Sequence, residues 1–278
     1  MNIFFAVNNG YVKYLLVALT SILENNKNEK IYFYVISSDI TDDNKNRIEL
    51  LKKAYSNFEI KYIVPDVSLF NNLKLNIEYI TVETYFRYII ADLVPNIDKC
   101  LYLDADLVVN SELKSLYDIN LNDNYCAGVE DIFINKIGYK KEIGFNNSDL
   151  YINAGVLLMN LEKIRKDGMV EKLFLVNQEW KEKIQFQDQD IINITFKSRI
   201  LNLNSIYNFT GTNVRREKNK RKDAVIIHYT GNRKPWMDGC RNKMKFLWKH
   251  YNDLTNSIIS NGKATKFNLI IHKVFSLF

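Results

Sequence analysis

The stretch Lys99-Cys-Leu-Tyr-Leu-Asp-Ala-Asp-Leu-Val-Val109 decides the fold and carries the strongest functional signal in the chain. Its apolar run from Cys100 to Leu103 predicts a buried strand. Side chains two residues apart in an extended segment point the same way, so Asp104 and Asp106 can direct their carboxylates at one point. Two converging carboxylates repel each other unless a cation lies between them. Because open α/β sheets bind ligands at the carboxyl ends of their strands, we expect a metal site here.

An Asp-x-Asp triplet by itself is weak evidence. Roughly a quarter of residues are charged, so a chain of this length holds on the order of one such triplet by chance. A second triplet, Asp188-Gln189-Asp190, lies in a stretch with helical spacing. Residues two apart on a helix point about 200° apart, so these two carboxylates cannot easily share a metal ion. Asp104 and Asp106 are therefore the better pair.

The composition is that of a globular protein. The chain has 278 residues and is 47% hydrophobic, which allows it to bury a full core. Its three cysteines have no spacing typical of a metal site. A small, odd number of cysteines favours a reducing compartment, and we expect Cys100 and Cys126 to lie in the core. Residues 1–10 lack a basic region and are interpreted as a first strand rather than a signal peptide. No apolar run reaches the length of a membrane span, and we expect a cytoplasmic protein.

The net charge of +6 is unevenly distributed. Residues 241–278 contain seven Lys and Arg against one acidic residue, whereas residues 1–240 hold equal numbers of acids and bases. We therefore expect a domain over residues 1–240 and a basic, aromatic tail over residues 241–278.

The order of predicted elements indicates an α/β fold. Hydrophobic patterning in the first half predicts strands and helices in alternation, with strands near 3–7, 31–36, 58–64 and 100–106 and helices near 11–25, 41–55 and 82–93. This order predicts a doubly wound, mostly parallel sheet. The second half is less regular, with strands near 125–129, 152–159 and 224–229, helices near 161–182 and 186–196, a mobile loop at 215–223 and a helix over 241–260.

Four stretches taken together resemble glycosyltransferase family 8: Phe5-Ala-Val-Asn8, Tyr102-Leu-Asp-Ala-Asp106, Phe186-Gln-Asp-Gln-Asp190 and His228-Tyr-Thr-Gly-Asn-Arg-Lys-Pro-Trp236. Thr84-Tyr-Phe-Arg87 and Asn153-Ala-Gly-Val-Leu-Leu-Met-Asn160 strengthen the resemblance, which covers about residues 1–240 and is closest to the bacterial lipopolysaccharide or lipooligosaccharide α-galactosyltransferase and glucosyltransferase branch. The resemblance implies a nucleotide-sugar transferase fold, which is a Rossmann-like α/β sandwich. It also implies retaining transfer of a hexose from a UDP-sugar with Mn²⁺, or Mg²⁺ as the second choice.

By this resemblance, Asp104, Asp106 and His228 are the metal ligands. Two carboxylates and one imidazole suit Mn²⁺ better than Ca²⁺. A lone His near the end of an apolar strand is more often structural, but Gly231 and Lys234 follow it. A glycine backbone can approach a phosphate closely and an ammonium adds positive charge, so the group favours diphosphate binding.

The resemblance also assigns residues to the donor and the acceptor. Ala6 and Asn8 match positions beside uracil, although Asp is usual where Asn8 stands, and ordinary turn chemistry is the alternative for this residue. Donor binding further includes Ala105, and sugar recognition falls to Arg87, Asn153, Asp188 and Gln189. As alternatives, Asp188 could be only a helix N-cap and Arg87 a surface residue. Asp131 matches a position near the acceptor.

The predicted catalytic residues are Gln189, Asp188 and Asp131. Retention through a covalent intermediate needs a nucleophile beside the anomeric carbon, usually a carboxylate. The matching position is Gln189, whose amide is a poor nucleophile. We therefore favour a front-face mechanism, in which the leaving phosphate oxygen helps to deprotonate the acceptor hydroxyl.

Residues 241–278 mix cations with aromatic residues, which is typical of segments that lie on an anionic membrane. The alternative is that the first part packs on the domain as an ordinary helix. No nucleic-acid-binding motif accompanies the charge. The expected partners are UDP-galactose or UDP-glucose, a glycan acceptor that is lipid-linked, and the inner membrane surface. A nucleotide-sugar hydrolase or nucleotidyltransferase, and a non-catalytic nucleotide-sugar binding module, are the competing functions.

Overall fold

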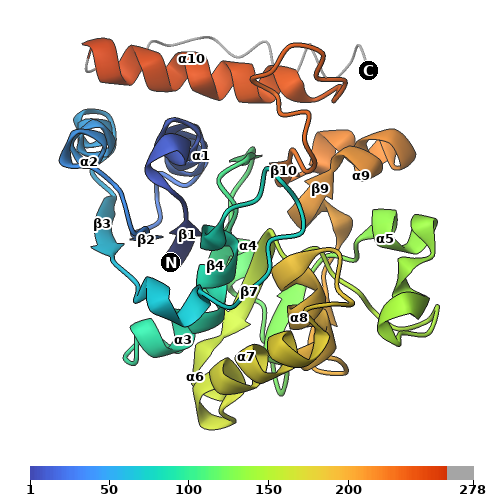
Figure 1. The fold of residues 1–278 in the computed structure, drawn as a ribbon. Coiled ribbons are helices and arrows are strands. Elements are labelled where there is room, and N and C mark those ends of the chain that lie inside the picture. Colours follow the sequence, from blue (N-terminus) through green and yellow to red (C-terminus); the bar gives the residue numbers. More distant parts are fainter. Residues whose placement is uncertain (262–278) are drawn as a thin grey trace.

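The computed structural model describes residues 1–261 and confirms the predicted α/β fold, in which a central sheet lies between two layers of helices (Figure 1). The strands of this sheet run in the order β3 (Phe58–Ile63), β2 (Ile31–Ile36), β1 (Asn2–Ala6), β4 (Lys99–Leu103), β7 (Val156–Asn160), β6 (Cys126–Gly128) and β8 (Ile200–Asn202). Strand β7 is antiparallel to both of its neighbours, and the other pairings are parallel. The sheet is therefore mostly parallel, as predicted.

A second, smaller sheet supplies the other side of the functional region. It consists of β5 (Leu107–Val109), β10 (Ile226–His228) and β9 (Phe209–Thr210), with β10 in the middle. Because β5 follows β4 after only three residues, the turn between them joins the two sheets. Residues 104–106 form this turn.

Helices cover both faces of the central sheet (Figure 1). On one face lie α1 (Val12–Asn25) and α2 (Asp42–Glu49), with α10 (Lys245–Asn261) packed over α1. On the other face lie η4 (Val82–Ile89), α3 (Ile90–Leu93), α6 (Leu161–Lys166), α7 (Met169–Trp180) and α8 (Gln187–Thr195). The remaining short elements are η1 (Asn9–Tyr11), η2 (Leu50–Lys53), η3 (Val67–Phe70), α4 (Lys114–Tyr117), α5 (Ile132–Ile137), η5 (Tyr139–Ile143), η6 (Ser205–Asn208), α9 (Gly211–Arg216) and η7 (Lys218–Asp223).

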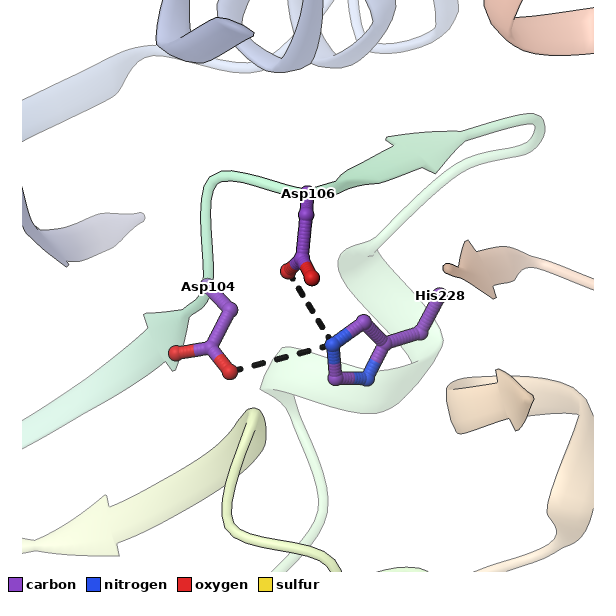
Figure 2. A group of neighbouring side chains, drawn as sticks. All are labelled: Asp104, Asp106 and His228. Carbon is purple, nitrogen blue, oxygen red and sulfur yellow. Dashed lines mark hydrogen bonds and ion pairs between the residues drawn. The ribbon is translucent and has the colours of Figure 1, made fainter. Parts of the chain in front are cut away.

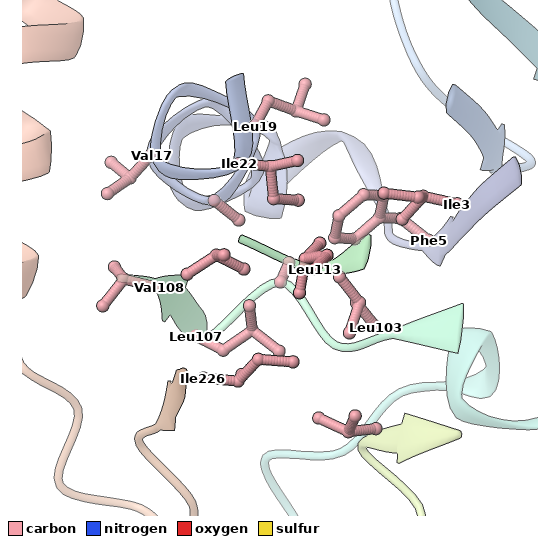
Figure 3. Close-up of a cluster of buried hydrophobic side chains, with 14 of the residues drawn as sticks. Ile3, Phe5, Val17, Leu19, Ile22, Leu103, Leu107, Val108, Leu113 and Ile226 are labelled. Carbon is pink, nitrogen blue, oxygen red and sulfur yellow. The ribbon is translucent and has the colours of Figure 1, made fainter. Parts of the chain in front are cut away.

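The alternation of side chains along β1 explains why the core has two halves. Ile3 and Phe5 point to the α1 side, where Figure 3 draws them with Ile22, whereas Phe4 belongs to the core on the opposite side. All four side chains are fully buried. A strand that is apolar on both faces belongs in the middle of a layered sheet, which is where β1 lies.

Three predicted elements differ from the structure for local reasons. The expected helix at 161–182 is divided into α6 and α7 at Gly168, whose φ of +63° is left-handed and ends the first helix. The expected strand at 152–159 begins only at Val156. The stretch 215–223 was wrongly expected to be a mobile loop, because it forms the end of α9 and then η7, where the guanidinium of Arg221 donates to the carbonyl of Val214.

Helix α10 shares the hydrophobic core with α1, as the alternative interpretation of the tail proposes. Leu247, Tyr251 and Ile258 are buried in the same cluster as the α1 side chains, and Tyr251 receives a hydrogen bond from Asn25. Residues 262–278 lie outside the described residues, so the division at residue 240 stays a prediction. No helix within residues 1–261 is long and apolar enough to cross a membrane.

Replacing Leu247 with Ala tests whether α10 belongs to the folded core. Leu247 is fully buried, so we expect the free energy of unfolding to fall by about 2–5 kcal/mol through lost burial and the resulting cavity. Lys249→Ala, at an exposed position of the same helix, is the control and should change stability by less than about 0.5 kcal/mol. Urea denaturation measures both values, and equal stabilities would contradict the packing.

Candidate functional site

All of the site residues predicted from the sequence line one cavity. This cavity, of about 810 Å³, lies beyond the carboxyl ends of β1 and β4 and extends to the second sheet. Its lining includes every predicted donor, catalytic and metal residue: Ala6, Asn8, Arg87, Asp104, Ala105, Asp106, Asp131, Asn153, Asp188, Gln189, His228, Gly231 and Lys234. The structure thus brings the predicted residues together, and their individual roles stay predictions.

The two aspartates and the histidine meet because of strand register. In the antiparallel pair of β10 and β5, His228 lies opposite Leu107, the residue after Asp106. The imidazole Nε2 lies 3.1 Å from a carboxylate oxygen of Asp106 and 3.7 Å from one of Asp104 (Figure 2). One ligand atom from each residue lies within 4.8 Å of the others, which fits a single divalent cation.

Asn208 determines which nitrogen of His228 faces this point. The amide nitrogen of Asn208 donates to Asn153 over 2.9 Å, which leaves its oxygen, 2.9 Å from the imidazole Nδ1, to accept a proton. With the proton on Nδ1, the lone pair of Nε2 is directed toward Asp104 and Asp106. Two carboxylates and a lone pair facing one another are repulsive until a cation lies between them, so the donor set fits a metal.

Lys234 supplies positive charge to the same carboxylates. Its ammonium is buried, donates to the Tyr229 carbonyl over 3.1 Å and forms an ion pair with Asp106. Burial alone would raise the pKa of Asp106, but the buried ion pair with Lys234 outweighs that effect and holds the pKa below its usual value. Asp106 is therefore kept ionised and available as a ligand.

Glycine is required at position 155 for these side chains to approach. Gly155 precedes β7, whose first residue pairs with the end of β4 beside Asp104. A Cβ at this position would overlap with the imidazole of His228 and the carboxylate of Asp104. Any larger residue would thus force the two ligands apart.

Arg87 joins the metal end of the cavity to α8. It lies 3.0 Å from Asp104 and 3.1 Å from Asp188, and only 5% of its side chain is exposed. Arg87 is therefore buried, and the alternative interpretation of it as a surface residue is wrong. Asp188 also accepts from the hydroxyl of Thr84, so it is not merely a helix cap. Burial raises the pKa of Asp188 to about 6, against the opposing effect of Arg87.

Gln189 is held rigidly on the other side of the cavity. Its carbonyl accepts from the side chain of Asn153 (2.9 Å) and the backbone of Ala154 (3.2 Å). Its amide donates to Asp131 (3.2 Å) and to the hydroxyl of Tyr151 (3.3 Å). The four hydrogen bonds determine the orientation of the amide, with its oxygen toward β7.

The side chain of Asn8 makes hydrogen bonds within its own turn and to Thr81, another residue that lines the cavity. Its carbonyl caps η1 by accepting from the backbone N–H of Tyr11 (3.1 Å), and its amide donates to Thr81 (3.3 Å). The turn chemistry that was the alternative reading is thus present, and Asn8 also lines the cavity.

Several lining or supporting residues were not found from the sequence. Asn208 ends a short 3₁₀ turn, where no periodic pattern singles it out. Phe133 and Ile137 line the cavity although 45% and 47% of each is exposed, and Arg215 lines it from α9. Residues 132–137 form a helix of only six residues, which is too short for helical periodicity to stand out, and the sequence pattern predicts a loop at Arg215.

Asn208→Ala tests the orientation of the imidazole. Losing the partner of a metal-binding His typically lowers metal affinity 10–100-fold, and we expect that loss for Mn²⁺ measured by titration calorimetry. Asn219→Ala, at an exposed position, is the control. Unchanged affinity in a folded Asn208→Ala protein would refute this role.

Asp188→Asn tests the burial of its carboxyl group. The native pKa of about 6 lies above the ordinary value of 3.8, so the native state binds more protons between these pH values. The contribution of this carboxyl to the free energy of unfolding of the wild-type protein therefore falls as pH rises through that window. The Asn variant does not show this fall, because its amide does not titrate. We expect the stability of the variant relative to the wild type to increase by about 2–3 kcal/mol from pH 4 to pH 7 in urea denaturation. A difference that stays flat over this pH range would contradict the burial.

Comparison with known proteins identifies the family to which the chain belongs. The family model for glycosyl transferase family 8 matches residues 2–240. A putative glycosyltransferase of Haemophilus influenzae is 34% identical over 249 residues, covering 86% of this chain and 74% of that protein. A lipopolysaccharide 1,2-glucosyltransferase of Escherichia coli is 32% identical over 255 residues, covering 85% of this chain and 73% of that protein.

Solved structures show the same fold. The galactosyltransferase LgtC, crystallised with donor and acceptor sugar analogues, has a TM-score of 0.82 at 30% identity, with 91% of this chain and 95% of that chain covered. Some relatives are much longer: Glycosyltransferase GlyA of Streptococcus pneumoniae is 34% identical over 90% of this chain, but that match covers 34% of GlyA. The resemblance found in the sequence motifs is confirmed, and the chain belongs to glycosyltransferase family 8.

Proposed function

We propose that this glycosyltransferase moves a hexose, galactose or glucose, from a UDP-sugar to a cell-surface glycan such as lipopolysaccharide, with retention of anomeric configuration and with Mn²⁺. The observation that carries the proposal is the convergence of Asp104, Asp106 and His228 in one cavity with Gln189 and Lys234. The galactosyltransferase LgtC and the lipopolysaccharide glucosyltransferase support the hexose and the class of acceptor.

At the metal end, this chain contributes charge and rigidity. A bound divalent cation supplies Lewis acidity to the diphosphate of the donor. Lys234, buried beside Asp106, adds a positive charge that stabilises the departing UDP. Gly231, with a φ of +83°, leaves its backbone free of a Cβ at the cavity wall.

At the sugar end, the buried polar network orients the hexose. Arg87 and Asp188 form an ion pair that faces the cavity, and Asn153 and Gln189 hold each other in place. Since the Gln189 amide is a poor nucleophile and is held by four hydrogen bonds, we favour the front-face route. Asp131, which bonds the Gln189 amide, is the residue that we place nearest to the acceptor.

We include attachment to the inner membrane surface in this proposal. The exposed cations of residues 241–261 support it, and the rest of the basic tail lies outside the described residues.

Product analysis tests the proposed reaction. Purified protein is incubated with Mn²⁺, a panel of UDP-sugars and a lipopolysaccharide-derived oligosaccharide, and the product is analysed by NMR. We expect an α-linked hexose from UDP-galactose or UDP-glucose, loss of transfer with EDTA, and at least a 100-fold lower rate for Asp106→Asn. Free hexose without a transfer product would favour a hydrolase. Donor binding without any turnover would favour a binding module.

The Gln189→Ala variant separates the two retaining mechanisms. Without an essential nucleophile at this position, we expect reduced but measurable transfer in the same assay. Complete loss with intact binding of the UDP-sugar would instead make Gln189 indispensable.

A further inference from the structure

The part of the chain that borders the cavity opposite the main sheet carries an unusual concentration of positive charge. Residues 211–243 contain ten Lys and Arg against three Asp and Glu, whereas residues 1–210 are acidic overall. Two of these cations face inward, because Lys234 is paired with Asp106 and Arg221 is buried. Most of the others remain at the surface.

Five of the surface cations form what we name the cationic rim: Arg215, Arg216, Arg233, Arg241 and Lys243. All five are exposed, and no ion pair with an acidic residue joins any of them within residues 1–261. The nearest acidic residue along α9, Glu217, is instead engaged by Lys220, Asn213 and Ser205.

Three segments bring the rim to the mouth of the cavity. Arg215 lines the cavity itself from α9, and Arg233 follows two lining residues, Gly231 and Asn232. The amide of Asn242, which lies between Arg241 and Lys243, is 3.8 Å from the place that a Cβ on Gly211 would occupy at the start of α9. The rim therefore continues outward from the cavity wall.

The position of the rim separates it from the donor site. Lys234 and the metal ligands lie in the buried part of the cavity, whereas the wall near Arg215 also includes Thr212 and faces α5, which packs against α9. Asp131, the residue that we place nearest the acceptor, caps α5. A sugar chain that enters past α5 and α9 would pass guanidinium groups that have no acidic partner before its end reached Asp131.

We propose that the cationic rim binds an acceptor glycan that bears phosphate or carboxylate groups on sugars near the one that is glycosylated. This inference rests on the proposed function. Guanidinium groups bind phosphate and carboxylate in a bidentate manner, and exposed cations without acidic partners are free to do so. Anionic acceptors would then be selected over neutral ones with the same sugar sequence, and the selection would weaken as salt screens the charges.

The test compares two acceptors that differ only in charge: a phosphorylated oligosaccharide from lipopolysaccharide and the same oligosaccharide after dephosphorylation. For the wild-type protein we expect kcat/KM to be about tenfold higher for the phosphorylated form at low salt, and this ratio to fall at 0.5 M NaCl. In the double variant Arg215→Gln/Arg233→Gln, the ratio of kcat/KM for the two acceptors should fall to within about twofold of unity. Arg47→Gln, an exposed arginine on the distant α2 (Figure 1), is the matched control and should keep the wild-type ratio.

The outcomes separate this inference from the proposed function. No transfer to either acceptor would overturn the proposed function, whereas equal transfer to both by the wild-type protein would overturn only the anionic acceptor. A third arm measures cosedimentation with phosphatidylglycerol vesicles. If the double variant lost binding to vesicles but kept the acceptor ratio, the rim would be a membrane contact, and the acceptor proposal would be wrong.

Discussion

The structure depends on one electrostatic constraint: two carboxylates held close together where a buried strand ends. Asp104 and Asp106 repel each other, and the chain surrounds them with compensating groups from distant segments. Arg87 comes from η4 and Lys234 from the loop after the second sheet, while His228 of β10 directs a lone pair at the same point. The turn that carries the two aspartates also joins the two sheets, so the groups that surround it come from both sides of the cavity.

The positive charges of Arg87 and Lys234 do not balance the carboxylates completely, and the remaining negative charge favours a cation. Arg87 is shared between Asp104 and Asp188, and Asp106 is the one acidic partner of Lys234 within residues 1–261. The remaining carboxylate oxygens face the lone pair of His228, whose proton is held on the opposite nitrogen by Asn208. A divalent cation is the simplest group that balances such a point, and a donor diphosphate would complete its coordination.

Local sequence patterns predicted the parts of the site that depend on a single strand or motif. The apolar run of β4 predicted a buried strand with Asp104 at its end, but the strand stops at Leu103, and Asp104 and Asp106 converge from the turn after it rather than through alternation along an extended segment. The approach of His228 depends on the pairing of two three-residue strands, which patterning alone cannot detect. For His228 it was the resemblance of the motif to a family that supplied the assignment.

Residues in supporting positions were missed for a related reason. Asn208 acts through a hydrogen bond to a residue 20 positions away, and no periodicity marks it. The break at Gly168 is a local effect of a left-handed glycine, whereas the packing of α10 on α1 is a tertiary contact that charge composition does not reveal. The cationic rim likewise emerges only when α9 and residues 241–243 are placed together.

The most direct test of the metal site is pulsed EPR on the protein loaded with Mn²⁺ and UDP. The account predicts coupling of the Mn²⁺ electron spin to one imidazole nitrogen and to phosphorus nuclei of the diphosphate, with the nitrogen coupling lost in His228→Ala. A Mn²⁺ spectrum with phosphorus coupling but no nitrogen coupling in the wild type, or one unchanged in the variant, would contradict it.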